Sequence, residues 1–293
     1  MRVHDHLTVD TPLSVLGIGA MPMSQGGFDL DAPAPVWHHA FNQGLNLINT
    51  ADCYCPSDDQ WGYNEQQVGR AVASYGRAEV FVVTKNGLVA RGDHWERDNS
   101  REYLLGAAER SCARLGFEPD ALLLHRRNRE QPLVEAIEAL LEIKTQGLTR
   151  HIGLSNVHLD ELDEAWLASD GQIAFVENER SPRYREDADV LARCNELGIA
   201  YLAWSPLGGH NAAGQLAELH PAFAEVAAAR GVSAQQIALA WLLAQGPAMT
   251  PIPAFRRIET ADDSIAATLL TLEHAEIDFL NASPVGPGSV YPD

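Results

Sequence analysis

The stretch Leu45-Asn46-Leu47-Ile48-Asn49-Thr50-Ala51-Asp52-Cys53-Tyr54 joins a short apolar run to a group of polar residues. The same order, an apolar run and then a polar side chain, recurs at Lys85, His125, Ser155-Asn156, Glu177-Asn178 and Ser205-Pro206. Amphipathic helical stretches separate these runs, and such alternation indicates a parallel sheet. In a barrel built this way, the chemistry lies at the carboxyl ends of the strands.

Eight apolar runs are the strand candidates: Leu13–Gly17, Leu45–Asn49, Val80–Thr84, Ala121–His125, His151–Leu154, Ala174–Glu177, Ala200–Trp204 and Met249–Ile252. Between them the spacing predicts helices, two of which begin after the capping residues Ser100 and Ser233. We therefore predict a single-domain (β/α)8 (TIM) barrel over residues 1–293, with a hairpin over 1–12 and a tail over 281–293. Three long loops follow strands, at Cys55–Tyr63, Gly87–Asn99 and Pro206–Gln215, where barrels usually carry function.

The composition excludes several classes of function. Net charge is −19, which opposes binding to a phosphate backbone, so we expect no nucleic-acid partner. We also find no apolar run of the roughly 20 residues that a membrane span needs. Four scattered cysteines fit a reducing compartment, and we expect a cytoplasmic protein. Cys53-x-Cys55 has no further ligands at zinc spacing, so we expect no metal.

Tyr54, Lys85 and His125 are the residues best suited to acid–base chemistry. A tyrosine can give a proton to a carbonyl oxygen, a lysine ammonium stabilises the resulting phenolate, and a histidine can orient the carbonyl. Singly, each has an ordinary explanation: a rim aromatic, a solvated strand end and a core histidine. Placed together at strand ends of one barrel, they indicate a catalytic site.

The sequence resembles the aldo-keto reductases in several motifs, which occur in order between about residues 13 and 280. These are Asn49-Thr50-Ala51-Asp52-Cys53-Tyr54 with Asn64-Glu65, Val83-Thr84-Lys85, Leu123-Leu124-His125-Arg126, Ile152-Gly153-Leu154-Ser155-Asn156, Ser205-Pro206-Leu207-Gly208 and Pro251-Ile252-Pro253 with Arg256-Arg257. The resemblance implies NADPH as cofactor and a small-molecule carbonyl as substrate. By the same resemblance, Tyr54 donates the proton, Lys85 lowers its pKa and His125 polarises the carbonyl.

The resemblance also implies a set of cofactor contacts. Ser155 and Asn156 would hold the nicotinamide carboxamide, and Ser205, Leu207 and Gly208 would cover the pyrophosphate. Arg256 and Arg257 would bind the 2′-phosphate, a role that suits the arginine fork.

Two departures from the family pattern affect the site. Asn49 stands where the family has an aspartate that pairs with the lysine, so we expect Lys85 to lose its counter-ion. Glu177 and Arg180 stand where the family has a glutamine and an aromatic residue. We expect Glu177 to accept a hydrogen bond from the carboxamide and Arg180 to stack on the nicotinamide.

The residues expected around the pocket mouth are aromatic, apolar or cationic: Met21, Trp61, Tyr63, Trp95, Arg126 and Arg127. The leading hypothesis is an NADPH-dependent reductase of an aldehyde, ketone or cyclic imine. Two alternatives stay open: a nicotinamide-binding sensor or subunit with weak turnover, and a non-redox dehydratase or isomerase on the same barrel. Retention of Tyr54, Lys85 and His125 argues against pure sensing.

Overall fold

The computed structural model describes residues 2–25, 27–91, 94–209 and 212–291. Its main sheet has eight parallel strands, in the spatial order β3 (Ile18–Gly19), β4 (Leu47–Asn49), β5 (Phe81–Asn86), β8 (Ala121–Leu124), β9 (His151–Ser155), β10 (Ile173–Glu179), β11 (Ala200–Trp204) and β12 (Met249–Pro251). Backbone bonds close the sheet on itself, from Gly17 N to Pro251 O and from Gly19 N to Pro253 O, both at 2.9 Å. The predicted TIM barrel is confirmed.

The closure depends on glycine. A Cβ atom at position 19 would lie 2.6 Å from the carbonyl oxygen of Ile252, a distance that no real side chain tolerates. Only a residue without a side chain lets the first and last barrel strands approach closely enough to share hydrogen bonds at this point.

The first barrel strand differs from the prediction of Leu13–Gly17. Leu13–Ser14 (β2) pairs antiparallel with Val3–His4 (β1), and the barrel strand is Ile18–Gly19. Leu13 is fully buried and belongs to the same apolar cluster as barrel residues such as Leu47. The β1–β2 ribbon therefore packs against the barrel interior. Residues 15–17 then connect β2 to the first barrel strand, β3.

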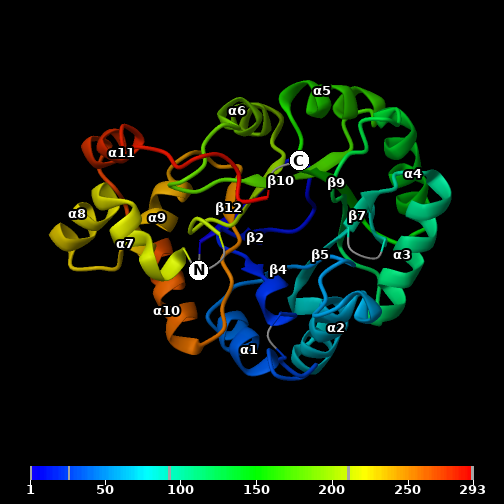
Figure 1. Ribbon diagram of the computed structural model, residues 1–293, viewed down its shortest axis with the longest axis horizontal. Helices are drawn as coiled ribbons and strands as arrows, with labels where there is room; N and C mark the ends of the chain where they lie inside the picture. The colour runs from blue at the N-terminus through cyan, green and yellow to red at the C-terminus, as the bar shows by residue number, and fades with distance from the viewer. Residues whose placement is uncertain (1, 26, 92–93, 210–211, 292–293) are drawn as a thin grey trace.

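Helices surround the barrel, as Figure 1 shows. They are α1 (Ala34–Asn42), α2 (Tyr63–Tyr75), α3 (Arg101–Leu115), α4 (Leu133–Thr145), α5 (Leu159–Ala168), α6 (Ala188–Leu197), α7 (Leu216–Leu219), α8 (Pro221–Arg230), α9 (Ala234–Leu243), α10 (Ile258–Ala266) and α11 (His274–Asn281). Both predicted serine caps are present: Ser100 accepts from Tyr103 N, and Ser233 accepts from Gln236 N. In Figure 1, α7, α8 and α11 gather on one side of the molecule. No described helix is both long and apolar enough to cross a bilayer.

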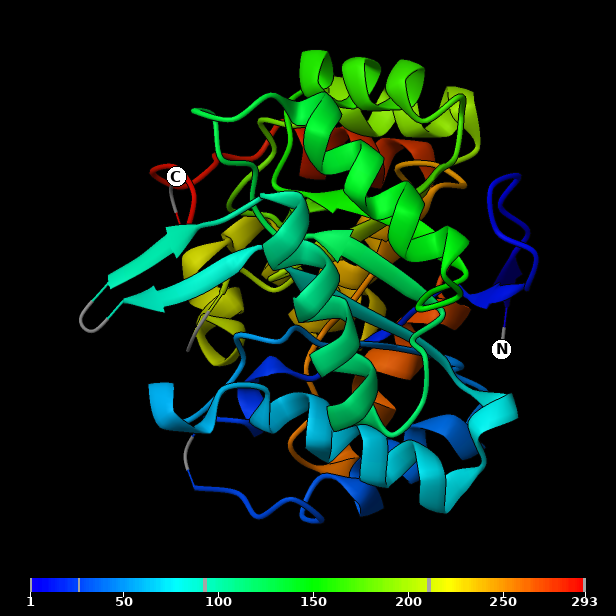
Figure 2. The same cartoon turned by 90° about the vertical axis from the view of Figure 1, so that its right-hand side faces the viewer.

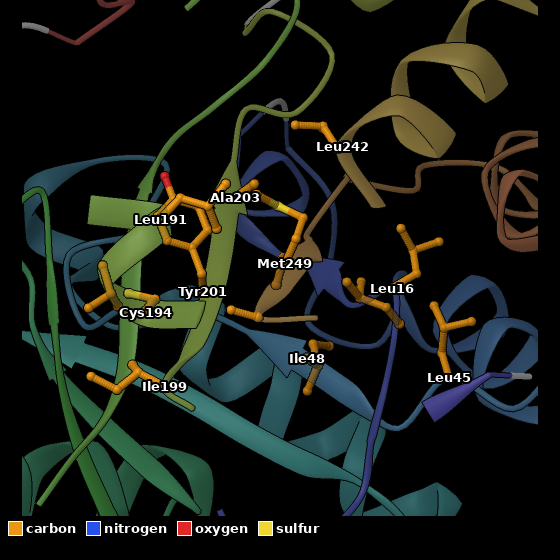
Figure 3. Packing of buried hydrophobic residues seen from close by; sticks show 14 of the residues in the cluster. Leu16, Leu45, Ile48, Leu191, Cys194, Ile199, Tyr201, Ala203, Leu242 and Met249 are labelled. Atoms are coloured by element: carbon orange, nitrogen blue, oxygen red, sulfur yellow. The ribbon is translucent and has the colours of Figure 1, made fainter. Parts of the chain in front are cut away.

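Strand residues alternate between two apolar clusters. One set, including Ile48, Tyr201, Ala203 and Met249, joins the large cluster between sheet and helices, part of which Figure 3 shows. The other set forms a separate cluster: Leu47, Phe81, Val83, Ala121, Leu123, Phe175, Ala200 and Leu202. Because side chains alternate with a period of two, residues 49, 85, 125, 177 and 204 continue this second set. At the carboxyl ends of the strands, the inward-facing residues are therefore no longer aliphatic; they are Asn49, Lys85, His125, Glu177 and Trp204.

The predicted loop Gly87–Asn99 is instead a β-ribbon, in which β6 (Leu88–Arg91) pairs antiparallel with β7 (His94–Arg97). Figure 2 shows this ribbon projecting from the same side of the molecule as the C-terminus, with β1 on the opposite side. The chain of residues 284–291 also returns to this side, where Ser289 Oγ donates to Glu179 Oε2 at 2.6 Å. The barrel mouth is therefore bordered by the ribbon and by the C-terminal tail.

Candidate active site

Asn49, Lys85 and Glu177 form a closed triangle of hydrogen bonds inside the barrel mouth. Lys85 Nζ donates to Asn49 Oδ1 at 2.6 Å and to Glu177 Oε1 and Oε2 at 2.9 and 3.1 Å. Asn49 Nδ2 donates to Glu177 Oε2 at 2.7 Å. The expectation that Lys85 lacks a counter-ion is wrong, because β10 supplies a carboxylate from across the barrel.

This triangle is fully enclosed, since the Lys85 side chain is 0% exposed and that of Glu177 is 2% exposed. A buried ammonium is costly unless it is paired and its protons are bonded, and both conditions are met here. The same contacts direct the Glu177 carboxylate to Lys85 and Asn49. The expectation that Glu177 accepts a hydrogen bond from the nicotinamide carboxamide stays a prediction, beside these bonds within the triangle.

Tyr54 lies next to the triangle, with Lys85 Nζ 5.2 Å from the centre of its ring. Burial, and next the Glu177 carboxylate, raises the pKa of Tyr54 well above its usual value. The phenol is consequently protonated at neutral pH. Within the described chain its hydroxyl makes no hydrogen bond, and Asn64 N holds the Tyr54 carbonyl at 3.0 Å. Tyr54 thus presents a protonated hydroxyl in a fixed position.

His125 stands edge-on to Tyr54, with ring centres 5.7 Å apart and planes at 84°. Its backbone N donates to Asn86 O at 2.8 Å, which fixes the residue just beyond β8. Burial, and next the positive charge of Lys85, lowers the pKa of His125 well below its usual value. The imidazole is therefore neutral, and its Nδ1 lies 3.4 Å from Cys53 Sγ. The contact leaves Nε2 as the ring nitrogen available to a substrate.

Asp52, Cys53 and His125 place one candidate metal-ligand atom each within 4.8 Å of one another. Burial, and next Glu65, raises the pKa of Asp52 to about 8, and burial also raises the pKa of the Cys53 thiol. Two of the three groups therefore hold a proton at neutral pH, which a cation would have to displace. The donor set is a poor one for a metal ion.

The residues expected to hold the nicotinamide carboxamide follow β9. Ser155 ends that strand, and Asn156 has a positive φ of 58°. Asn156 Nδ2 donates to His125 O at 3.0 Å, and Trp204 Nε1 donates to Asn156 Oδ1 at 3.1 Å. Asn156 thereby connects the ends of β8, β9 and β11.

The expected pyrophosphate loop begins at Ser205, which has a positive φ of 49°. Gly208 N donates to Ser205 O at 2.9 Å, so the residues from Ser205 through Leu207 to Gly208 form a tight turn. Asn and Gly tolerate positive φ, whereas a serine there is uncommon. Such unusual backbone at a strand end is typical of ligand-binding loops.

Two arginine predictions have different outcomes. Arg180 is buried, and its Nη1 donates to Asp187 Oδ1 at 2.8 Å, so the structure commits it to an ion pair where stacking on a nicotinamide was expected. Arg256 and Arg257 are both exposed at the start of α10. Neither guanidinium forms an ion pair or hydrogen bond with the part of the chain that the structure describes, so both can reach an anionic ligand.

The residues expected at the pocket mouth separate into two groups. Trp61 and Trp95 pack edge to face at 5.7 Å, and Met21 is partly exposed in the turn after β3. Tyr63 and Arg127 are directed elsewhere. Tyr63 Oη donates to Phe28 O at 2.9 Å, and Arg127 Nη1 pairs with Glu161 Oε1 at 3.1 Å.

Sequence analysis missed two contributors to the mouth. Trp204 continues the inward set of β11, a placement that the period of two in Ala200–Trp204 could have revealed. The tail brings Tyr291 to within 5.9 Å of the Trp204 ring, and Arg126 Nη2 donates to Tyr291 O at 2.8 Å. The position of the C-terminal tail could not be predicted from its own sequence, because it depends on contacts with Arg126, Glu179 and Trp204.

Comparison with known proteins agrees with this geometry. The model of the aldo/keto reductase family matches residues 15–283. This protein belongs to the aldo/keto reductase family, and it is therefore an oxidoreductase. An aldo-keto reductase of Gibberella moniliformis is 30% identical, with 94% of this chain and 90% of the relative covered. An uncharacterised oxidoreductase of Schizosaccharomyces pombe is 29% identical over 90% of this chain and 84% of its own length.

Solved structures have the same fold. A thermostable aldo-keto reductase crystallised with the inhibitor epalrestat has a TM-score of 0.80 and 26% identity, with 96% of this chain and 99% of that chain covered. An aldo-keto reductase of Klebsiella pneumoniae in complex with NADPH has a TM-score of 0.80 and 24% identity, with coverage of 96% and 95%.

Proposed function

We propose that this aldo/keto reductase reduces a small-molecule carbonyl compound with NADPH and that Tyr54 donates the proton. The observation that carries the proposal is the arrangement around Tyr54. A protonated phenol lies beside both the buried ammonium of Lys85 and the neutral ring of His125, at the carboxyl ends of the barrel strands. This is the set that protonation of a carbonyl oxygen requires.

The chain's own residues fit a phosphate-bearing nicotinamide. Arg256 and Arg257 are exposed and can bind the 2′-phosphate, while the turn from Ser205 to Gly208 lies at a strand end, where barrels bind phosphate groups. The solved Klebsiella relative in complex with NADPH supports the same cofactor. When bound, NADPH supplies the hydride that adds to the carbonyl carbon.

The protein supplies the proton and the electrostatic setting. The Tyr54 hydroxyl gives its proton to the carbonyl oxygen as that oxygen becomes negative, so the product is an alcohol. Lys85 stabilises the phenolate that remains on Tyr54. His125 can donate from Nε2 to the same oxygen, because its ring is neutral and Nδ1 faces Cys53. Trp61, Trp95 and Trp204 suit an apolar body in an aldehyde, a ketone or a cyclic imine.

The test uses purified protein in two steps. NADPH should quench tryptophan fluorescence, because Trp204 lies beside the Asn156 amide at the expected nicotinamide site. NADPH absorbance is then followed with a panel of aldehydes, ketones and cyclic imines. Binding with turnover of at least one carbonyl class supports the proposal. Binding without turnover across the panel would favour a sensor, and consumption of substrate without NADPH oxidation would favour dehydration or isomerisation.

A further inference from the structure

We infer that Glu177 is the positioning residue that keeps Lys85 charged, and that it does so in place of an acid at position 49. The inference rests on the proposed function for its consequence in catalysis, although the pairing itself can be tested without turnover. It assigns to β10 the counter-ion that the family pattern places on β4, and it makes Asn49 and Glu177 a matched pair.

The hydrogen-bond directions show why the pair is matched. Asn49 faces the ammonium of Lys85 with its oxygen at 2.6 Å and the carboxylate of Glu177 with its nitrogen at 2.7 Å. An amide offers an acceptor to the ammonium and a donor to the carboxylate, whereas an ionised carboxylate has acceptors alone. An ionised aspartate at position 49 would set its second oxygen against Glu177, so two carboxylates would compete for one buried lysine.

Other charged or titratable groups around Lys85 and Tyr54 do not provide the same compensation. Within the described ranges, Glu177 is the one carboxylate paired with Lys85. Cys53 and His125 also face the site, but both are neutral at neutral pH, since burial holds the thiol protonated and the imidazole deprotonated. The remaining groups that act on Tyr54 and Cys53 are Arg126, Tyr291, Asp52 and Cys55, and burial raises the pKa of the Cys55 thiol. Arg126 adds positive charge, and the pKa of Asp52 is raised to about 8, so Asp52 is mostly protonated.

Loss of the Glu177 charge has a defined consequence. A fully buried amine without a carboxylate beside it favours its neutral form. A neutral Lys85 cannot stabilise the Tyr54 phenolate, so kcat falls as the ammonium loses its proton. In the variant this loss occurs at lower pH, and the basic limb of the pH profile of kcat therefore moves to lower pH. A purely structural role for Glu177 would leave that limb in place.

The experiment is a double-mutant cycle of wild type, Glu177→Gln, Asn49→Asp and Asn49→Asp/Glu177→Gln. We expect kcat of Glu177→Gln to fall by roughly 100-fold with little change in the Kd for NADPH, and its basic limb to move to lower pH. The double variant, which has one carboxylate on the opposite side of Lys85, should regain at least tenfold of the lost kcat and much of the pH profile. Failure of the double variant to recover, with both proteins folded, would overturn the inference.

The matched control is Asp120→Asn. Asp120 is also a buried, paired carboxylate, because it accepts from Val82 N at 2.7 Å and pairs with Arg150 at 2.6 Å. It directly precedes β8 and so lies at the amino end of the barrel, away from Tyr54. This variant should lower stability and leave the pH profile of kcat unchanged. A shift of the profile in Asp120→Asn would show that general destabilisation explains the effect of Glu177→Gln.

Urea unfolding of the same proteins separates this inference from the proposed function. At pH 7, Glu177→Gln should unfold at a lower urea concentration than wild type, because the buried amine loses the carboxylate that pairs with it. The double variant should unfold nearer to wild type. This pattern supports the pairing even if wild type reduces no carbonyl, a result that would refute only the proposed function. If Glu177→Gln does not fold, a folded double variant supports the inference, and two unfolded variants beside a folded Asp120→Asn overturn it.

Discussion

Lys85 of β5 and Glu177 of β10 meet across the barrel mouth, with Nζ 2.9 Å from Oε1. They are 92 positions apart in the chain, and both are fully buried. The pair fixes a positive charge 5.2 Å from the centre of the Tyr54 ring, and the Glu177 carboxylate compensates that charge. Under the proposed function, the phenolate that forms when Tyr54 gives up its proton would therefore have a cation nearby.

Tyr54→Phe should abolish NADPH-dependent reduction while NADPH binding stays close to wild type. Phenylalanine keeps the ring that packs beside Lys85 and His125 but has no proton to give. The expected loss in kcat is about 100-fold or more. Steady-state rates with the best carbonyl of the panel and fluorescence titration with NADPH measure the two quantities. Turnover within a few-fold of wild type would show that another group protonates the substrate.

NADPH should bind at least tenfold more tightly than NADH, a difference of about 1.4 kcal/mol. The reason is the exposed pair Arg256 and Arg257, which can bind the 2′-phosphate that NADH lacks. Titration of both cofactors gives the ratio. Arg257→Ala should reduce it, whereas Arg70→Ala, which removes an exposed arginine paired with Asp31, should not. Equal affinities in wild type would give the arginine pair another role.

Asn49→Asp should have opposite effects on stability in two backgrounds. In wild type it adds a second carboxylate beside Lys85, so the folded protein takes up a proton or holds an unpaired charge. We expect the pKa of the new aspartate to lie above the ordinary aspartate value near 4. The loss of stability should therefore grow as the pH rises above about 4. In the Glu177→Gln background the same change restores the missing charge and should stabilise. Denaturant unfolding at pH 5 and pH 8 checks both signs; equal effects in the two backgrounds would contradict the pairing.

The buried carboxyl group of Asp52 should make the stability of wild type fall as pH rises. Burial, and next Glu65, raises its pKa to about 8, so between roughly pH 4 and pH 8 the folded state holds a proton that the unfolded state releases. This contribution lowers the stability of wild type as pH rises through that window, by up to about 1.4 kcal/mol per pH unit. Asp52→Asn has no carboxyl group at this position to release a proton on unfolding. The stability of the variant relative to wild type should therefore increase as the pH rises from 4 to 8. A constant difference over that range would mean that Asp52 is ionised in the fold.

The fold and the acid–base residues could be predicted because they depend on local patterns. Each strand is a short apolar run, and the period of two carries the inward side of β4, β5 and β10 from Leu47, Val83 and Phe175 to Asn49, Lys85 and Glu177. The pairings could not be predicted in the same way. Asn49 and Glu177 were noted as separate departures, and their complementarity appears only when two strands 128 positions apart face each other across the barrel.

The ion pairs of Arg127 and Arg180 could not be predicted for a related reason. Each arginine follows a strand that carries site residues, and the sequence therefore favoured a ligand-binding role. Their partners, Glu161 of α5 and Asp187 at the start of α6, lie on helices that follow later in the chain. An arginine at a strand end contacts either a ligand or such a helix, and the choice depends on tertiary packing that local spacing does not encode.

The central claim, reduction of a carbonyl by hydride transfer with Tyr54 as proton donor, is tested most directly by isotope transfer. The protein is incubated with a carbonyl substrate and NADPH deuterated at the reactive C4 position of the nicotinamide, and the product is analysed by mass spectrometry. We predict an alcohol with one deuterium on the former carbonyl carbon, formed by wild type and not by Tyr54→Phe. A product without deuterium, or equal labelling by the Tyr54→Phe variant, would contradict the account.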